Sequence, residues 1–162
     1  MAAMNTLELE WEIAKFLNPR INIIVPNVFW GLDFQYELDL LCVTQAGWGT
    51  EVELKVSAGD IKADLTKRHK HDSNRIRRFF YGVPDYLADC EYLPKDAGLI
   101  VVDSKKCFNQ NRRVQILRAP KFNRLARKFT DAEIQKLLAL GCMRIWGLKE
   151  SIYNRCFRHK DK

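Results

Sequence analysis

The stretch YELDLLCVTQAGWGTEVELKV, residues 36–56, decides the architecture of this protein. Residues 36–43 are mostly apolar and predict a β-strand, and the Gly-Trp-Gly segment after them predicts a turn. Residues 51–56 alternate charged and apolar side chains, which predicts a second strand that carries its charges on one face. A plain amphipathic strand shows the same alternation, so this pattern by itself leaves the role of the charges open. We expect the two strands to pair as a β-hairpin with a rather long connection.

Such a hairpin can bring two carboxylates and one ammonium group to the same place. Asp39 interrupts the first strand, and Glu53 and Lys55 lie on one face of the second. Two carboxylates about 4 Å apart repel by about 4 kcal/mol at an effective dielectric near 20, so such a pair shares a proton or binds a cation. Oxygen ligands favour Mg²⁺ or Mn²⁺ over zinc, and a hard metal beside a lysine suits phosphodiester hydrolysis.

A third carboxylate lies in the amphipathic helix predicted for residues 5–17. Asn5 or Thr6 is its expected N-cap, and Pro19 ends it. Glu10 projects into the middle of the apolar face, where a carboxylate costs several kcal/mol unless something pairs with it. The alternative is that Glu10 lies on the surface and the helix is rotated from the phase assumed here.

These residues resemble the PD-(D/E)XK nuclease superfamily over residues 6–84, about half of the chain. Asp39 is followed fourteen residues later by Glu53-Leu54-Lys55, with an acidic helix before this pair and a helix and further strands after it. Leu38 stands where the motif has proline. The segments ELKVSAGDIKADL (53–65) and FFYGVP (79–84) resemble more narrowly the MmcB-like DNA-repair branch and related small phage-encoded proteins.

The resemblance implies a metal-dependent DNA endonuclease with a restriction-endonuclease-like core, acting in DNA repair, recombination or phage genome processing. Asp39 and Glu53 would bind Mg²⁺ or Mn²⁺ with the main-chain carbonyl of Leu54, Lys55 would orient the water or stabilise the transition state, and Glu10 would face the metal. The alternative is a catalytically inactive DNA-binding or scaffolding protein that keeps the nuclease fold. RNA as the substrate and a homodimer are both left open.

Other acidic residues near this set have simpler interpretations. Asp60 belongs to the S-x-x-D capping pattern that begins at Ser57, and Asp64 suits the helix dipole of a helix predicted to run to about residue 71. The resemblance adds that both residues can position this helix against the strand of the site. Glu37 and Glu51 are expected nearer to solvent and are not expected to bind the metal.

The remaining pattern predicts an α/β or α+β fold with a central mixed sheet of four to six strands and helices on both faces. A loop with Pro26 and Gly31 is followed by the hairpin, and further strands are expected at 78–83, 97–102 and, at an edge, 113–117. A helix at 130–140 ends at Gly141, and a last helix follows at 143–157. The 162 residues predict one nuclease-like domain, with a core of about 5–120 and a helical appendage of about 121–157.

The composition indicates the expected cellular location and the kind of molecule that the protein binds. No apolar run reaches the ~20 residues of a membrane span and no leader pattern is seen, so a cytoplasmic location is expected. The five cysteines form no C-x-x-C pair and are expected to be reduced and mostly buried. The net charge of +7 suggests a polyanion, although solubility alone explains such a surplus.

Basic residues cluster after residue 66, and about half of them are accounted for as ordinary solvated charge. As a set beside an acidic hairpin they predict phosphate contacts to DNA. The residues expected to bind nucleic acid are Lys67, Arg68, Lys70, Arg75, Arg77, Arg112 and Arg113. The aromatic residues among them that can stack on unpaired bases are Phe108, Phe122 and Phe129, although core packing is the commoner use of such residues.

Overall fold

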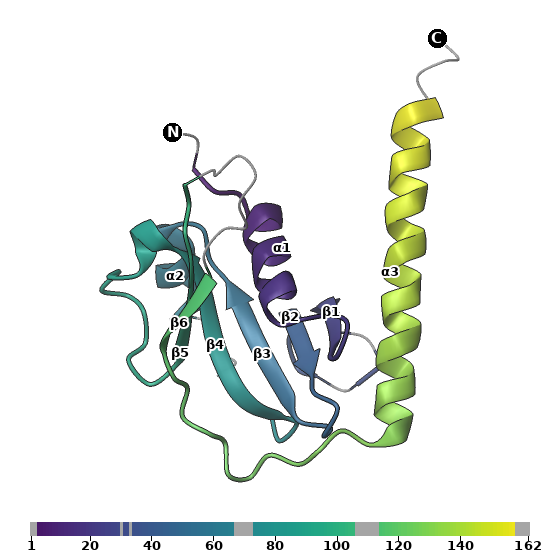
Figure 1. The fold of residues 1–162 in the computed structure, drawn as a ribbon, viewed down its shortest axis with the longest axis horizontal. Helices are drawn as coiled ribbons and strands as arrows, with labels where there is room; N and C mark the ends of the chain where they lie inside the picture. Colours follow the sequence, from purple (N-terminus) through teal and green to yellow (C-terminus); the bar gives the residue numbers. More distant parts are fainter. Residues whose placement is uncertain (1–2, 30, 33, 67–72, 106–113, 158–162) are drawn as a thin grey trace.

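A six-stranded mixed sheet with the order β1-β2-β3-β4-β5-β6 forms the centre of the molecule (Figure 1). The computed structural model describes residues 3–29, 31–32, 34–66, 73–105 and 114–157. The helices are α1 (Thr6–Phe16), α2 (Ala58–Asp64) and α3 (Asp131–Phe157), with a short 3-10 helix at Asp85–Leu87. The strands are β1 (Ile23–Val28), β2 (Leu38–Val43), β3 (Gly49–Leu54), β4 (Ile76–Pro84), β5 (Gly98–Val102) and β6 (Val114–Arg118).

The predicted hairpin is present as β2 and β3, which pair antiparallel from Val43↔Gly49 to Leu40↔Val52. The chain then crosses through α2, and β4 and β5 continue the sheet in parallel with β3. Strand β6 pairs antiparallel with β5 at the edge, as the sequence predicted. The predicted fold class is confirmed as α+β, with a mixed sheet and helices packed against it.

Helix α1 covers one face of the sheet. Asn5 caps it through a capping box with Glu8, and Leu9 and Ile13 are fully buried against residues that include Leu40 and Val52. The helix lies very close to β4, since a Cβ added at Gly82 would lie 2.4 Å from Cδ1 of Ile13. Glycine at position 82 therefore sets how near α1 can approach the sheet.

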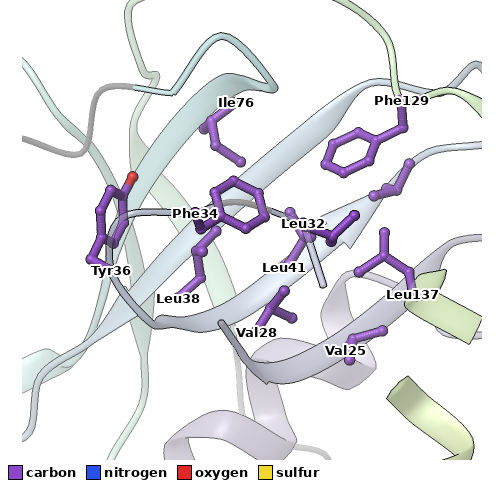
Figure 2. Packing of buried hydrophobic residues seen from close by; sticks show 11 residues of the cluster. Val25, Val28, Leu32, Phe34, Tyr36, Leu38, Leu41, Ile76, Phe129 and Leu137 are labelled. Carbon is purple, nitrogen blue, oxygen red and sulfur yellow. The ribbon is translucent and has the colours of Figure 1, made fainter. Parts of the chain in front are cut away.

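The other face is covered by α2 and by the first turns of α3. Ile61 of α2 packs with a cluster that includes Tyr81 and Val83, while Leu137 of α3 packs with a cluster that includes Phe129 and Leu41. Figure 2 shows this second cluster, in which side chains from β1, β2 and the segment between them meet Leu137. The helices thus lie on both faces of the sheet, as predicted.

Strand β1 was not predicted, because Pro26 favours a loop. Pro26 lies in the middle of β1, opposite Leu40, and β1 forms the edge of the sheet beside β2. An edge strand has one side that makes no ladder bonds, so a residue without an N–H group is tolerated there. The next residue, Asn27, has a φ of +51°, and after it Val28 packs in the same cluster as Val25.

The predicted helix end at Gly141 is wrong, because α3 runs without interruption from Asp131 to Phe157. Glycine inside a helix costs only about 1 kcal/mol, and the flanking leucine, alanine, methionine and arginine are strong helix formers. Beyond Gly141 the helix exposes large apolar side chains, namely Met143, Ile145, Trp146, Leu148, Ile152 and Tyr153. Among the described residues no helix is long and apolar enough to cross a membrane.

Two further expectations need correction. The helix predicted to run to residue 71 ends at Asp64, with Leu65 as its C-cap, and residues 67–72 are outside the described part of the chain. The cysteines were expected to be mostly buried, but of the four described free thiols only Cys42 is buried, and Cys142 and Cys156 are exposed on α3. The exposure follows from the projection of α3 beyond the sheet (Figure 1).

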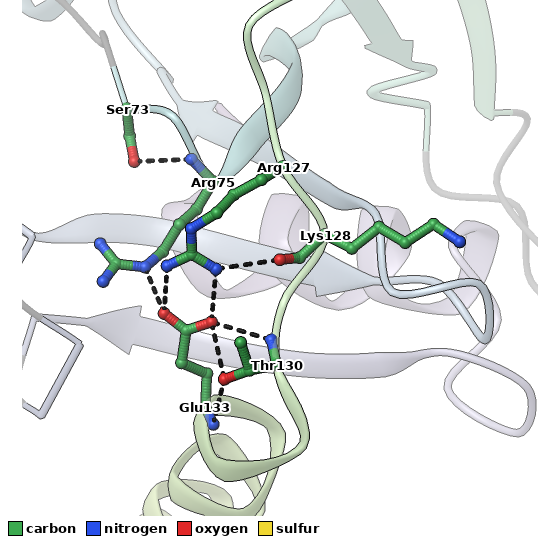
Figure 3. Close-up of polar contacts among 6 residues, drawn as sticks. All are labelled: Ser73, Arg75, Arg127, Lys128, Thr130 and Glu133. Atoms are coloured by element: carbon green, nitrogen blue, oxygen red, sulfur yellow. Dashed lines mark hydrogen bonds and ion pairs between the residues drawn. The ribbon is translucent and has the colours of Figure 1, made fainter.

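A charged cluster joins the N-terminus of α3 to the start of β4 (Figure 3). Oε1 of Glu133 accepts hydrogen bonds from Nε of Arg75 at 2.6 Å and from Nη2 of Arg127 at 2.7 Å. The same carboxylate accepts from the backbone N–H of Thr130, and Thr130 accepts in return from the N–H of Glu133, so the predicted capping box is confirmed. Mainly through Arg127, these contacts hold the pKa of Glu133 well below its usual range.

We expect Glu133→Gln to lower the free energy of unfolding by about 2 kcal/mol at pH 7, because charge-assisted hydrogen bonds to two arginines are lost. A depressed carboxylate pKa stabilises the fold above the pKa of the unfolded chain and loses this effect as pH falls through the folded value. The difference between wild type and variant should therefore shrink below about pH 4. Urea denaturation at several pH values measures this difference, and Glu150→Gln on the exposed part of α3 is the control. If Glu133→Gln lowers the free energy of unfolding equally at every pH, the electrostatic explanation is wrong.

Candidate functional site

The candidate site lies where the β2–β3 ladder ends. The ladder ends with the pair Leu40↔Val52, and beyond it the backbone N–H of Leu54 donates to Oδ2 of Asp39 at 2.8 Å. A side-chain carboxylate therefore takes the place of the backbone acceptor that β2 would otherwise supply. This contact brings Asp39 beside the Glu53-Leu54-Lys55 segment, as the sequence predicted.

Lys55 is buried, with 6% of its surface exposed, so its ammonium group needs partners. Its Nζ lies 2.5 Å from Oε1 of Glu53 and 3.2 Å from Oδ1 of Asp64. Its backbone N–H donates to the carbonyl of Gly82 at 3.0 Å, which fixes the residue to β4. Two carboxylates from two elements thus hold one lysine at the end of β3.

Asp64 takes a more direct part in the candidate site than the sequence pattern indicates. It is buried on the last turn of α2, and its Oδ2 accepts a hydrogen bond of 2.8 Å from the hydroxyl of Tyr81 on β4. Burial, followed by this hydrogen bond, raises the pKa of Tyr81, so the phenol stays a donor at neutral pH. These contacts agree with the interpretation that Asp64 positions α2 against the strand of the site. The sequence indicates this position because Asp64 follows Ile61 by three residues, which places both side chains on the inner face of α2. Asp60 is exposed, and its N–H donates to Ser57 Oγ as the capping pattern predicted.

Glu51 is also placed differently from the expectation. It was expected near solvent, but it is fully buried, and its Oε2 accepts a hydrogen bond of 3.1 Å from the Tyr36 hydroxyl. The reason is that the segment before β2 folds back over this face of β3, bringing Tyr36 into the cluster of Figure 2. Glu37 is exposed, in agreement with the prediction.

Glu10 reaches the neighbourhood of Asp39 from α1. It is half-buried and lines a groove between α1, β1 and α3, together with residues that include Asn27 and Arg144. Burial and the negative charge of Asp39 raise the pKa of Glu10. Burial and the same Asp39 charge raise the pKa of Glu53, with Lys55 acting in the opposite direction. The negative charge of Asp39 therefore acts on both of the other carboxylates and adds to the effect of burial in raising the pKa of each.

The donor chemistry of this set fits a hard divalent cation. In the described part of the chain no group of three or more His, Cys, Asp and Glu side chains is arranged to hold a metal. Magnesium sites commonly use only one or two protein carboxylates, with waters and substrate phosphate completing the shell. Asp39 and Glu53 meet that requirement, and a bound cation would offset both the burial of the Glu53 carboxylate and its repulsion by Asp39, which together raise the pKa of Glu53.

The residues expected to bind nucleic acid are only partly covered by the structure. Lys67, Arg68, Lys70, Arg112 and Arg113 lie outside the described residues. Arg75 is paired with Glu133, as Figure 3 shows. The guanidinium of Arg77 lies 3.9 Å from the ring centroid of Trp48 and is partly exposed.

Comparisons with known proteins add information on the fold. No family model matches the chain, and no curated protein matches it. A solved structure described as SPO1766, a protein of unknown function from Silicibacter pomeroyi, is similar, with a TM-score of 0.60 and 16% sequence identity. The match covers 100% of this chain and 98% of that chain. At this identity the similarity concerns the fold alone.

We expect Asp39→Asn to raise the free energy of unfolding at pH 7 by about 1 kcal/mol, because a negative charge close to Glu10 and Glu53 is removed. A carboxylate whose pKa is raised by folding stabilises the fold below the pKa of the unfolded chain and loses this effect as pH rises through the folded value. Wild type therefore carries a penalty at neutral pH from Glu10 and Glu53, and removal of the Asp39 charge relieves it.

Thermal unfolding at pH 7 and at pH 4 measures this effect, and the gain should be absent at the lower pH. Asparagine keeps an oxygen that accepts from the Leu54 N–H, so the backbone contact is retained. Asp89→Asn, an exposed change of the same type, is the control. A loss of stability at both pH values would mean that Asp39 acts only as a structural acceptor.

Proposed function

We propose that this protein is a Mg²⁺- or Mn²⁺-dependent deoxyribonuclease of endonuclease type, built on a PD-(D/E)XK, restriction-endonuclease-like core. The observation that carries the proposal is the arrangement at the end of β3, where the Asp39 carboxylate binds the Leu54 N–H beside the buried Glu53–Lys55 ion pair. The order of elements, with α1 before three strands and α2 before β4, supports it. The proposed setting is cytoplasmic DNA repair, recombination or phage genome processing.

Each residue has a proposed task. Asp39 and Glu53, with the main-chain carbonyl of Leu54, hold the metal, and Glu10 faces it from α1. A bound metal lowers the pKa of water and polarises a phosphate oxygen. Lys55 donates hydrogen bonds to the attacking water and to the charge that develops on the phosphate. The water oxygen attacks phosphorus and gives up a proton to solvent, the bond from phosphorus to the leaving sugar oxygen breaks, and that oxygen takes up a proton from solvent.

Asp64 and Tyr81 are proposed as positioning residues. A lysine ammonium has a flexible four-carbon stem, so its placement depends on groups that surround it. The 3.2 Å contact from Lys55 to Asp64, with Asp64 held in turn by Tyr81, restrains the ammonium group near Glu53.

The test is cleavage of labelled DNA in the presence of Mn²⁺, with duplex, single-stranded, flap and four-way-junction substrates. We expect Asp39→Ala and Lys55→Ala each to lower the rate by about 100-fold or more, since each removes a group that acts on the transition state. Lys62→Ala, which removes an exposed lysine on α2, is the matched control and should cleave like wild type. Equal behaviour of wild type, Asp39→Ala and Lys55→Ala on every substrate would refute the assignment.

Calorimetric titration with Mn²⁺ separates a nuclease from an inactive relative of the same fold. We expect wild type to bind Mn²⁺ and Glu53→Gln to lose this binding. The metal binds the deprotonated carboxylate, and the pKa of Glu53 is raised, so Mn²⁺ affinity should already decline at a pH above the ordinary carboxylate value of about 4.5. Mn²⁺ binding that is unchanged in Glu53→Gln would instead favour the alternative of a DNA-binding or scaffolding protein.

A further inference from the structure

Cations and aromatic rings gather at the end of the β3–β4 pair opposite to the candidate site. We define this basic–aromatic patch by Trp48, Arg77, Arg78, Phe122 and Lys128. The guanidinium of Arg77 lies 3.9 Å from the ring centroid of Trp48 and 5.6 Å from that of Phe122. Arg78 lies 5.2 Å from the Phe122 centroid, and Lys128 lies 5.6 Å from the Trp48 centroid.

The patch is assembled from segments that are distant in sequence but firmly joined. The segment between β6 and α3 crosses below the starts of β3 and β4 (Figure 1). The N–H of Asn123 donates to the carbonyl of Arg77 at 3.0 Å, and its side chain donates to Ser73 and Ile76 carbonyls at 3.2 Å each. The N–H of Phe129 donates to the carbonyl of Gly47 at 2.9 Å, so both ends of the segment are fixed. The patch is therefore preorganised.

The cations of the patch differ from those of the neighbouring charged cluster. Arg75 and Arg127 are both ion-paired with Glu133. Within the ranges that the structure describes, no carboxylate is ion-paired with Arg77, Arg78 or Lys128. Their positive charge is thus available to an anion, and Arg78 and Lys128 are exposed.

Phe122 suggests which anion fits. It is 55% exposed and is flanked by two guanidinium groups, so an apolar face lies open to solvent between positive charges. Aromatic side chains and arginine planes stack on bases that are not held in a duplex, and nearby cations contact the phosphates between them. In a duplex the base faces are covered by neighbouring pairs, so this combination favours unpaired nucleotides.

We propose that the basic–aromatic patch binds single-stranded DNA, with Phe122 stacking on a base and Arg77, Arg78 and Lys128 contacting phosphates. The inference rests on the proposed function and specifies its substrate as DNA with an unpaired stretch. Glu53 lies five residue steps after Trp48, which corresponds to about 17 Å of extended chain. A single strand of a few nucleotides spans this distance, so one DNA segment can reach both ends of the strand.

The experiment measures binding of a fluorescein-labelled dT20 strand and of a 20-bp duplex by anisotropy, without divalent metal. We expect wild type to bind the single strand more tightly than the duplex. Phe122→Ala should weaken single-strand binding about tenfold, the loss of one stacked base, with little change in the salt dependence. Arg78→Gln should weaken it and lower the slope of log K against log salt by about 0.7.

The matched control is the double variant Trp146→Ala, Lys149→Gln. It removes an exposed pair on α3 in which Nζ of Lys149 lies 5.1 Å from the ring centroid of Trp146. This variant should bind dT20 only slightly more weakly than wild type, because one distant positive charge is lost. Circular dichroism confirms that each variant is folded, and Phe122→Leu, which keeps the apolar volume without the ring, should also bind weakly. Binding of dT20 that is unaffected in both Phe122→Ala and Arg78→Gln, or a preference for duplex, overturns the proposal.

Lys55→Ala separates this inference from the proposed function. Lys55 is buried at the far end of β3 and acts in the proposed cleavage, so loss of cleavage in this variant reports on the nuclease proposal, whereas the patch variants report on binding of the single strand. If wild type does not cleave but the patch variants lose single-strand binding, the nuclease proposal fails and the binding surface stands. If cleavage depends on Lys55 but the patch variants bind normally, the binding surface fails alone.

Discussion

The buried ammonium group of Lys55 is the constraint on which the candidate site depends. A lysine that is 6% exposed is tolerated only with charged partners, and here Glu53 comes from its own strand and Asp64 from the helix that follows. Removing one member of such a buried group leaves another charge uncompensated, which typically costs about 3–5 kcal/mol. The positions of β3 and α2 are therefore linked through one side chain.

That link explains several neighbouring features. Ser57 caps α2 two residues after Lys55, so the helix starts directly from the end of β3 and has to lie where Asp64 reaches the ammonium group. Tyr81, opposite Glu53 in the β3–β4 register, completes the arrangement from the next strand. Glu51 and Asp64 are buried, and each accepts a hydrogen bond from a tyrosine hydroxyl. Asp39 is partly exposed and accepts from the Leu54 N–H beyond the end of the β2–β3 ladder.

The two ends of the β3–β4 pair differ in chemistry. At one end carboxylates from β3 and α2 hold one lysine, with Asp39 of β2 bonded to the Leu54 N–H beside them, and at the other end Arg77 and Arg78 lie with Trp48 and Phe122. A net charge of +7 says nothing about such a separation. The proposed function uses it directly, because a phosphate backbone is attracted by the cationic end while the metal is attracted by the acidic one.

Local sequence patterns were sufficient wherever the physical cause is local. The hairpin follows from alternation and a Gly-Trp-Gly turn, the helix starts follow from Asn5, Ser57 and Thr130, and the convergence of Asp39, Glu53 and Lys55 follows from pairing two adjacent strands. Local patterns failed where the cause is tertiary. Pro26 is accommodated only because β1 is an edge strand. Gly141 is a different case, because the strong helix formers on both sides of it continue α3 and this cause is local.

The sequence by itself determined the α+β class and the set of charged residues at the end of the hairpin, because two-residue periodicity, capping and turn formation act between near neighbours. Only the tertiary structure decided that Glu51 is buried beneath Tyr36, that Asp64 reaches Lys55, and that Glu133 is ion-paired with Arg75 while Arg77 stays available. These outcomes depend on which distant segments fold over a given face, and the burial of a charge depends on all the atoms around it.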